Sequence, residues 1–282
     1  DLGKLTACEA GMDWHIDQVL ALPSVDVPAV QAAGFKVAVD AVHSSGSVAI
    51  PMLLDKMGVV YHNLYPEPHG RFPHNPEPLE EHLAAIIDEV SKGSYDLGIV
   101  VDPDVDRLAF IDENGAMFGE EYTLVLVADY LLSLTSGHVV SNMSSSKSLR
   151  DLAELKGSTY SPSAVGEVNV VNEMKSKNAV LGGEGNGGII LPELHYGRDA
   201  LVGIALALTY LAKSGKTMSE LRSGYPQYYM AKHKIELIPG LDVESILATI
   251  AGRYSDEELS TIDGLKITWS DRWVHLRKSN TE

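Results

Sequence analysis

The sequence is poor in cysteine and in basic residues. Cys8 is the single cysteine among 282 residues, which excludes an internal disulfide framework and a metal site built from several cysteines. Lysine and arginine number 22 against 39 aspartates and glutamates, so the formal net charge is −17. Because such a chain repels phosphate groups, the composition argues against a general nucleic-acid or membrane-surface binder.

Long apolar runs are also missing. No segment reaches the length of a membrane-spanning helix, and no signal peptide is visible. With 45% hydrophobic residues and a mean hydropathy of −0.01, we expect a soluble globular chain with a large core, more than one domain and a cytoplasmic location. The chain starts without Met and stops just after a strand-like run, so we expect a piece of a longer protein.

Short apolar runs alternate with helical patterns along most of the chain, which is typical of α/β units. The expected strands cover residues 36–42, 59–64, 95–101, 108–115, 138–143 and 178–183. The expected helices cover residues 48–58, 79–93, 122–135, 148–157, 165–177 and 199–215. After about Tyr228 the order becomes strand 234–238, helix 242–254 and strands 264–269 and 273–278. We therefore expect two consecutive three-layer α/β domains and part of a C-terminal α+β domain.

An acidic loop separates two of the expected strands. Asp102, Asp104 and Asp106 occupy alternate positions and are followed by Arg107. Side chains at alternate positions of an extended segment point to the same side, so these three carboxylates can converge. Their mutual repulsion would be offset by a hard divalent cation, and Mg²⁺ fits a set of oxygen ligands. Arg107 could pair with one carboxylate or with a bound phosphate.

An EF-hand calcium loop is the competing interpretation of this segment. It also starts with alternating aspartates, and Glu113 falls at the twelfth position counted from Asp102. The sixth position, however, is Arg107 where the EF-hand turn needs glycine, and the flanking segments are predicted strands rather than helices. The sequence favours a magnesium loop.

Two further loops carry polar groups after predicted strands. LGGEGNGGII (181–190) places glycines around Glu184 and Asn186, and a carboxylate beside an amide suits sugar hydroxyls, which donate and accept hydrogen bonds. No Gly-Lys-Ser/Thr follows, so this is not a P-loop. HLRKSNTE (275–282) gathers Arg277, Lys278, Ser279, Asn280 and Thr281, and such a set of cations and hydroxyls fits a phosphate cradle.

Taken in order, these segments resemble the α-D-phosphohexomutase superfamily. Its metal loop reads D-G-D-G/A-D-R, its sugar loop G-E-x-S-G-H and its phosphate loop R-x-S-G/N-T-E-P, and here they are DPDVDR, GEGNGG and RKSNTE. FPHNPEP (72–78) and GRDAL (197–201) are also similar to family segments. The resemblance implies a linker over 1–13, domain 2 over 14–116, domain 3 over 117–228 and part of domain 4 over 229–282.

The resemblance also implies a function and a role for each site residue. The intact protein would be an intramolecular phosphotransferase of the phosphoglucomutase/phosphomannomutase type, acting through a phosphoserine and a hexose 1,6-bisphosphate. Asp102, Asp104 and Asp106 would hold Mg²⁺, and Arg107 would help hold the transferring phosphoryl group. The substrate-binding residues of the hexose phosphate would be Glu184, Asn186, Arg277, Ser279, Asn280 and Thr281.

This chain departs from the family pattern at three places. No T-A-S-H-N-P-type segment is present: the one HNP, at residues 74–76, follows Phe72 and Pro73, so the chain alone is expected to be inactive. Asn186 and Gly188 replace the usual serine and histidine of the sugar loop, which leaves the hexose open. A phosphoglucosamine mutase, a non-catalytic sugar-phosphate-binding protein and a calcium-binding module remain as alternatives. We expect lone histidines such as His15, His195 and His233 to be structural.

Overall fold

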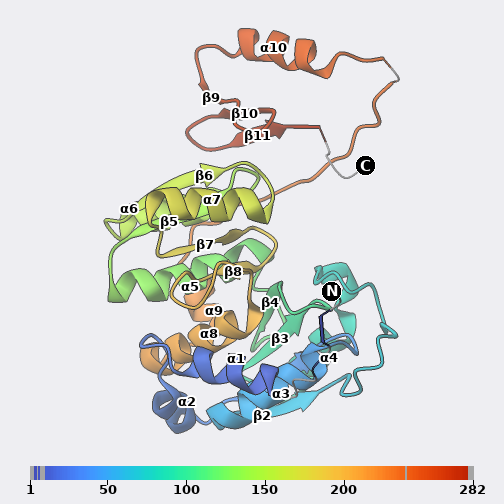
Figure 1. Cartoon of the computed structure of the whole chain (residues 1–282), viewed down its shortest axis with the longest axis vertical. Helices are drawn as coiled ribbons and strands as arrows, with labels where there is room; N and C mark the ends of the chain where they lie inside the picture. The colour runs from blue at the N-terminus through green and yellow to red at the C-terminus, as the bar shows by residue number, and fades with distance from the viewer. Residues whose placement is uncertain (1–2, 5, 7–9, 239, 279–282) are drawn as a thin grey trace.

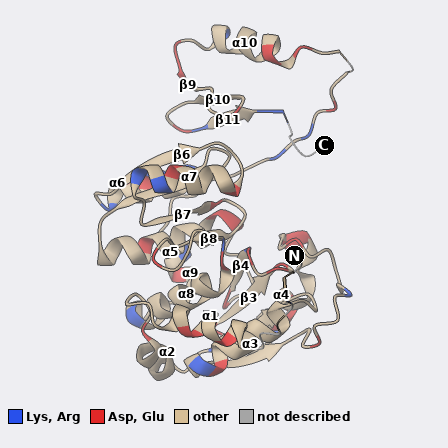
Figure 2. Cartoon of the chain, viewed as in Figure 1, with Lys and Arg blue, Asp and Glu red and all other residues tan. Residues whose placement is uncertain are grey.

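The computed structural model describes residues 3–4, 6, 10–238 and 240–278. It consists of two α/β domains packed on each other and a small C-terminal unit that lies at one end of the molecule (Figure 1). Acidic residues are spread over all parts of the chain (Figure 2). In the part of the chain described, no helix is long and apolar enough to cross a membrane.

The first domain is built on a four-stranded sheet with the order β2-β1-β3-β4, in which β4 alone is antiparallel to its neighbour. Helices cover both faces, so β3 and β4 are buried at every residue. Its strands are β1 Lys36–Asp40, β2 Val60–Asn63, β3 Leu97–Val101 and β4 Leu108–Asp112. Its helices are α1 Gly11–Leu20, α2 Val27–Ala33, α3 Gly46–Met57, the short 3₁₀ turn η1 Glu80–His82 and α4 Ala84–Lys92.

The second domain repeats this topology, with the strand order β6-β5-β7-β8 and β8 antiparallel to β7. Its strands are β5 His138–Asn142, β6 Thr159–Ser163, β7 Leu181–Glu184 and β8 Gly188–Ile190. Its helices are α5 Glu120–Leu134, α6 Ser148–Leu155, α7 Glu167–Lys177, α8 Ala200–Ser214 and α9 Met218–Ser223. The β3–β4 hairpin of the first sheet and the β7–β8 hairpin of the second therefore occupy equivalent places.

One hydrophobic core joins the two domains. It runs from Ile16 in α1 to Tyr225 after α9 and includes buried side chains from both sheets. Helix α8 is buried along most of its length and contacts α1 and α2 of the first domain as well as α5 of the second. Two smaller clusters fill the outer faces, where α4 covers the first sheet and α7 covers the second. The two sheets are thus held in one body by shared helices.

The C-terminal unit differs from the sequence expectation at its beginning. Residues 234–238, expected as a strand, have no regular structure. The unit instead contains helix α10 Val243–Arg253 and an antiparallel sheet of β9 Glu258–Ser260, β10 Leu265–Thr268 and β11 Trp273–Leu276. The expectation for 234–238 was wrong because an apolar run becomes a strand only when a neighbouring strand pairs with it, and the third strand of this sheet is β9.

Candidate functional site

The acidic loop lies between β3 and β4 and is a tight turn rather than an extended segment. The N–H of Val105 donates to the carbonyl of Asp102 at 3.2 Å, and Val105 has a positive φ of 62°. Oδ1 of Asp102 accepts the N–H groups of Asp106 and Arg107, each at 3.1 Å. The turn, not strand alternation, therefore brings the three aspartates together.

The three carboxylates each place an oxygen within 4.8 Å of the others. Asp102 is buried, Asp106 is half-buried and Asp104 is exposed. Burial and the neighbouring Asp102 carboxylate raise the pKa of Asp106 to about 7. Oδ1 of Asp106 is buried and has no hydrogen-bond partner within the described part of the chain. A free, buried carboxylate oxygen beside two further carboxylates fits a hard divalent cation.

Arg107 follows the three aspartates and extends toward the FPHNPEP segment (72–78). Its Nη1 lies 3.1 Å from Oε1 of Glu77, and its Nε lies 3.7 Å from Oδ2 of Asp102. The guanidinium is thus held at the rim of the acidic loop by one carboxylate from outside it and one from within it.

The glycine-rich loop forms the β7–β8 hairpin. Glu184 ends β7 and is buried; its Oε1 accepts from Nδ2 of Asn142 at 2.9 Å, and its Oε2 accepts from Nη1 of Arg198 at 3.1 Å. Asn186 uses its side-chain oxygen to accept the N–H of Gly188 at 3.2 Å. These bonds hold the turn and fix the Glu184 carboxylate at its base.

The acidic loop and the glycine-rich loop lie directly against each other. Arg107 and Gly188 form an isolated antiparallel bridge, and the N–H of Leu108 donates to the carbonyl of Gly187 at 3.2 Å. The guanidinium of Arg198 pairs with Asp106 on one side and with Glu184 on the other. The two loops of the two domains therefore form one continuous polar site.

The terminal loop is described only in part. Arg277 follows β11 in the C-terminal unit, where its Nη1 lies 3.7 Å from Oδ2 of Asp263. Ser279, Asn280 and Thr281 fall outside the described residues. The structure thus brings together Asp102, Asp104, Asp106, Arg107, Glu184 and Asn186, and it places Arg277 in a separate unit.

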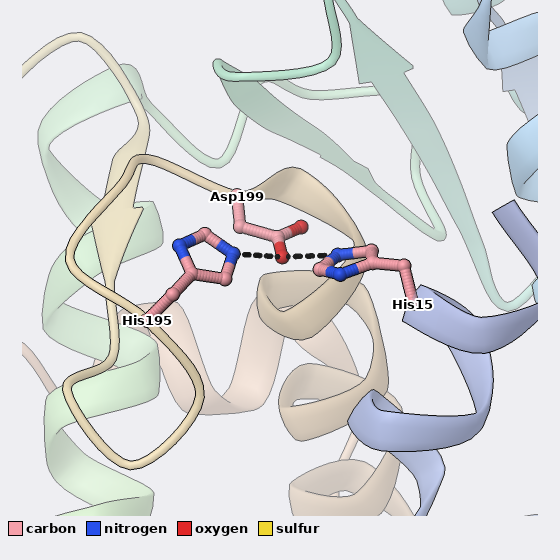
Figure 3. Close-up of side chains that lie close together, drawn as sticks. All are labelled: His15, His195 and Asp199. Carbon is pink, nitrogen blue, oxygen red and sulfur yellow. Dashed lines mark hydrogen bonds and ion pairs between the residues drawn. The ribbon is translucent and has the colours of Figure 1, made fainter. Parts of the chain in front are cut away.

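Sequence reasoning missed two features next to this site, Arg198 and a cluster around Asp199. Figure 3 shows His15 of α1 and His195 directed at the same carboxylate, with Nε2 to Oδ2 distances of 2.7 and 3.1 Å. The other oxygen of Asp199 accepts the N–H groups of Leu201 and Val202 and so caps α8. The capping aspartate of GRDAL was visible in the sequence, but nothing in the sequence indicated its histidine partners.

The cluster suits hydrogen bonds rather than a metal. Nδ1 of His195 accepts the N–H of Gly197 at 2.9 Å, so the ring proton sits on Nε2 and is donated to Asp199. The Asp199 carboxylate raises the pKa of His15 through their hydrogen bond. Although the Asp199 carboxyl is buried, both histidines hold its pKa well below the usual range. The cluster therefore fastens α1 to the start of α8, in line with the structural role expected of His15 and His195.

Comparisons with known proteins agree with this arrangement. Residues 13–115 match the family model of phosphoglucomutase/phosphomannomutase alpha/beta/alpha domain II, and residues 119–229 match domain III. A phosphoglucomutase/phosphomannomutase of Thermococcus kodakarensis is 37% identical over 262 residues, which cover 92% of this chain and 57% of that protein. A probable phosphoglucosamine mutase of Methanopyrus kandleri is 29% identical over 285 residues, 100% of this chain and 62% of that protein.

A solved structure supports the same conclusion. A phosphoglucomutase/phosphomannomutase family protein of Burkholderia thailandensis superposes with a TM-score of 0.82 at 25% identity, covering 96% of this chain and 58% of that one. The chain thus spans about three fifths of the length of these relatives. The two matched domains make up most of the sequence, and the chain belongs to the phosphoglucomutase/phosphomannomutase family.

Proposed function

We propose that the protein to which this chain belongs interconverts hexose 1-phosphate and hexose 6-phosphate with Mg²⁺. The observation that carries the proposal is the meeting of the acidic loop and the glycine-rich loop in one polar site. Such a site offers carboxylates for a cation beside groups that recognise hydroxyls. A phosphoglucosamine mutase, as the relative from Methanopyrus kandleri is named, is the alternative within the family. A non-catalytic sugar-phosphate-binding protein is the alternative outside catalysis.

Asp102, Asp104 and Asp106 would hold the cation, and the buried free oxygen of Asp106 supports this assignment. Bound Mg²⁺ would neutralise negative charge on the transferring phosphoryl group. Asp102 keeps the turn closed by accepting two backbone N–H groups. Arg107 stands at the rim of this loop, from where we propose that it holds the phosphoryl group.

Glu184 and Asn186 would bind the sugar. Each oxygen of Glu184 accepts one hydrogen bond from the protein, so each keeps a lone pair for a sugar hydroxyl. The amide oxygen of Asn186 is engaged by Gly188, and we propose that its N–H groups donate to a hydroxyl. Arg277, Ser279, Asn280 and Thr281 would hold the phosphate that does not react.

In the proposed reaction, a phosphoserine of the intact protein transfers its phosphoryl group to a hexose monophosphate. The serine hydroxyl is regenerated and a hexose 1,6-bisphosphate forms. The bisphosphate turns around and returns its other phosphoryl group to the serine, so the enzyme ends as it began. This chain alone, which matches domains II and III, is therefore proposed to lack turnover.

A coupled assay for the conversion of glucose 1-phosphate to glucose 6-phosphate tests the proposal. It uses Mg²⁺ and trace bisphosphate, and compares this chain with one extended upstream by the gene's own sequence. We expect turnover in the extended protein alone, and its loss when Asp102→Asn is introduced there. Turnover with glucosamine phosphate only would favour the phosphoglucosamine mutase. A folded extended protein that binds but does not convert glucose, mannose or glucosamine phosphates would refute catalysis.

A further inference from the structure

Arg198 stands between the two loops of the site and pairs with three carboxylates. Its guanidinium contacts Asp106 of the acidic loop, Glu184 of the glycine-rich loop at 3.1 Å, and Glu167 at the start of α7 at 3.4 Å. The side chain is 15% exposed. Arg198 therefore lies within the site rather than on its surface, yet it belongs to neither loop.

The chain on both sides of Arg198 is firmly held. Its own N–H donates to Oε1 of Glu167 at 3.0 Å. The next residue, Asp199, is gripped by the two histidines of Figure 3. The N–H of Ala200 then donates at 3.0 Å to the carbonyl of Val105 inside the acidic loop. The backbone thus fixes the start of the Arg198 side chain against the acidic loop.

Gly188 leaves the room that the Arg198 side chain occupies. A Cβ placed on Gly188 would lie 2.5 Å from Cδ of Arg198, which is closer than two carbon atoms can approach. This is the position at which the family pattern carries histidine. Any side chain there would displace the arginine. The observed position of the Arg198 side chain therefore requires glycine at residue 188.

Arg198 also pairs with one of the two oxygens of a carboxylate that would bind the cation. Oδ2 of Asp106 pairs with Arg198, whereas the buried Oδ1 has no hydrogen-bond partner among the described residues. Arg107, the neighbouring cation, has its Nη1 on Glu77 and its Nε 3.7 Å from Asp102, whereas Arg198 pairs with Asp106. Arg198 is thus placed to balance the negative charge of the acidic loop, and a cation bound at Asp106 would face a fixed positive charge across the same carboxylate.

We propose that Arg198 is a positioning residue that acts as the counter-ion of the acidic loop and competes with Mg²⁺ for the charge of Asp106. Glu184 and Glu167 hold the guanidinium in place on its other side. Cation affinity is therefore set by a residue of the second domain and not by the three aspartates alone. The inference rests on the proposed function, because it takes the acidic loop to be the Mg²⁺ site.

Calorimetric titration of this chain with MgCl₂ alone tests the inference without any measurement of turnover. It is made at about pH 8.5, where carboxylates are ionised. Arg198→Met keeps much of the apolar stem and removes the charge, so we expect the Kd for Mg²⁺ to fall about tenfold or more. Arg198→Lys keeps the charge and stays within about threefold of the unsubstituted chain. Lys92→Met removes an equal charge from an exposed ion pair on α4 and is the matched control.

Gly188→Ala provides an independent variant that leaves the charge in the protein. Its methyl group would push Arg198 away from Asp106, so the Kd for Mg²⁺ should shift in the same direction as in Arg198→Met. Circular dichroism verifies the fold of each variant.

The outcomes separate this inference from the proposed function. An unchanged or higher Kd in folded Arg198→Met, with Mg²⁺ still bound, overturns the inference and leaves the proposed Mg²⁺ site intact. Binding that appears only in Arg198→Met supports both. No Mg²⁺ binding by any of these proteins overturns both.

Discussion

Replacement of Gly187 by alanine tests how tightly the two loops fit together. Gly187 has a φ of +88° at the tip of the β7–β8 hairpin, and a Cβ there would lie 2.2 Å from the carbonyl oxygen of Leu108 and 3.0 Å from its nitrogen. Leu108 begins β4 and donates its N–H to the carbonyl of Gly187. The added methyl group therefore meets backbone that it cannot push aside without moving a strand.

Two terms set the expected loss of stability. A non-glycine residue with positive φ costs about 1–2 kcal/mol, and displacing packed atoms adds about 1–3 kcal/mol. We therefore expect Gly187→Ala to lower the free energy of unfolding by about 2–5 kcal/mol. Gly215 at the end of α8 has a φ of +63° with nothing within 4 Å of an added Cβ, so Gly215→Ala carries the first term alone.

Urea unfolding followed by circular dichroism measures the free energy of unfolding of the unsubstituted chain and of the two variants. Gly187→Ala should lose at least about 1 kcal/mol more than Gly215→Ala, since the backbone contact is present in the first variant only. Equal losses in the two variants would show that the hairpin tip yields freely, and the close fit between the loops would be refuted.

Three further predictions concern single side chains. The hydrogen bond to the buried Asp199 carboxylate raises the pKa of His15 above 6.5 in the folded protein, which NMR titration measures. This bond stabilises the fold fully below pH 6.5, and the stabilisation is lost as the pH rises through the pKa of the folded state. A destabilisation by His15→Gln that does not shrink with rising pH would contradict this. Asp129 is buried and accepts hydrogen bonds from the hydroxyl groups of Tyr210 and Tyr225 at 2.6 and 2.9 Å, so Asp129→Asn should lose about 2–3 kcal/mol in urea unfolding, and a loss below about 0.5 kcal/mol would count against the bonds. Asp102→Asn keeps an oxygen for the turn but removes charge, so calorimetry should find Mg²⁺ binding at least about tenfold weaker with the fold intact, and unchanged affinity would exclude Asp102 as a ligand.

The strands around the site could be predicted because they are buried on both faces. The expected strands 95–101 and 108–115 contain the continuous apolar runs 97–101 and 108–111, and these runs lie in β3 and β4. Strand β8 has three residues and begins with glycine, so it has no pattern long enough to recognise. Helix α9 was also missed, although Thr217 and Glu220 form a capping box before it. The capping box, rather than hydrophobic periodicity, was the sequence signal that would have predicted this helix.

The partners of the site residues could not be predicted from the sequence. Arg198 and Asp106 are 92 positions apart, and His15 and Asp199 are 184 positions apart. Such pairs form because α8 packs against both domains, and no local pattern encodes that packing. The sequence predicted that the three aspartates converge, but from the geometry of an extended segment. The turn that brings them together depends on Val105 adopting a positive φ, which its residue type does not suggest.

The core that runs unbroken from α1 to Tyr225 bears on how relatives can be recombined. A chimera that joins the first domain of one family member to the second domain of another would bring together helix faces that had never been matched. Because α8 contacts both domains, mismatched contacts on this helix would lower the stability of both, and neither domain would fold well. A crossover within residues 226–238, which have no regular structure, avoids that core. The two domains are best exchanged as a single piece.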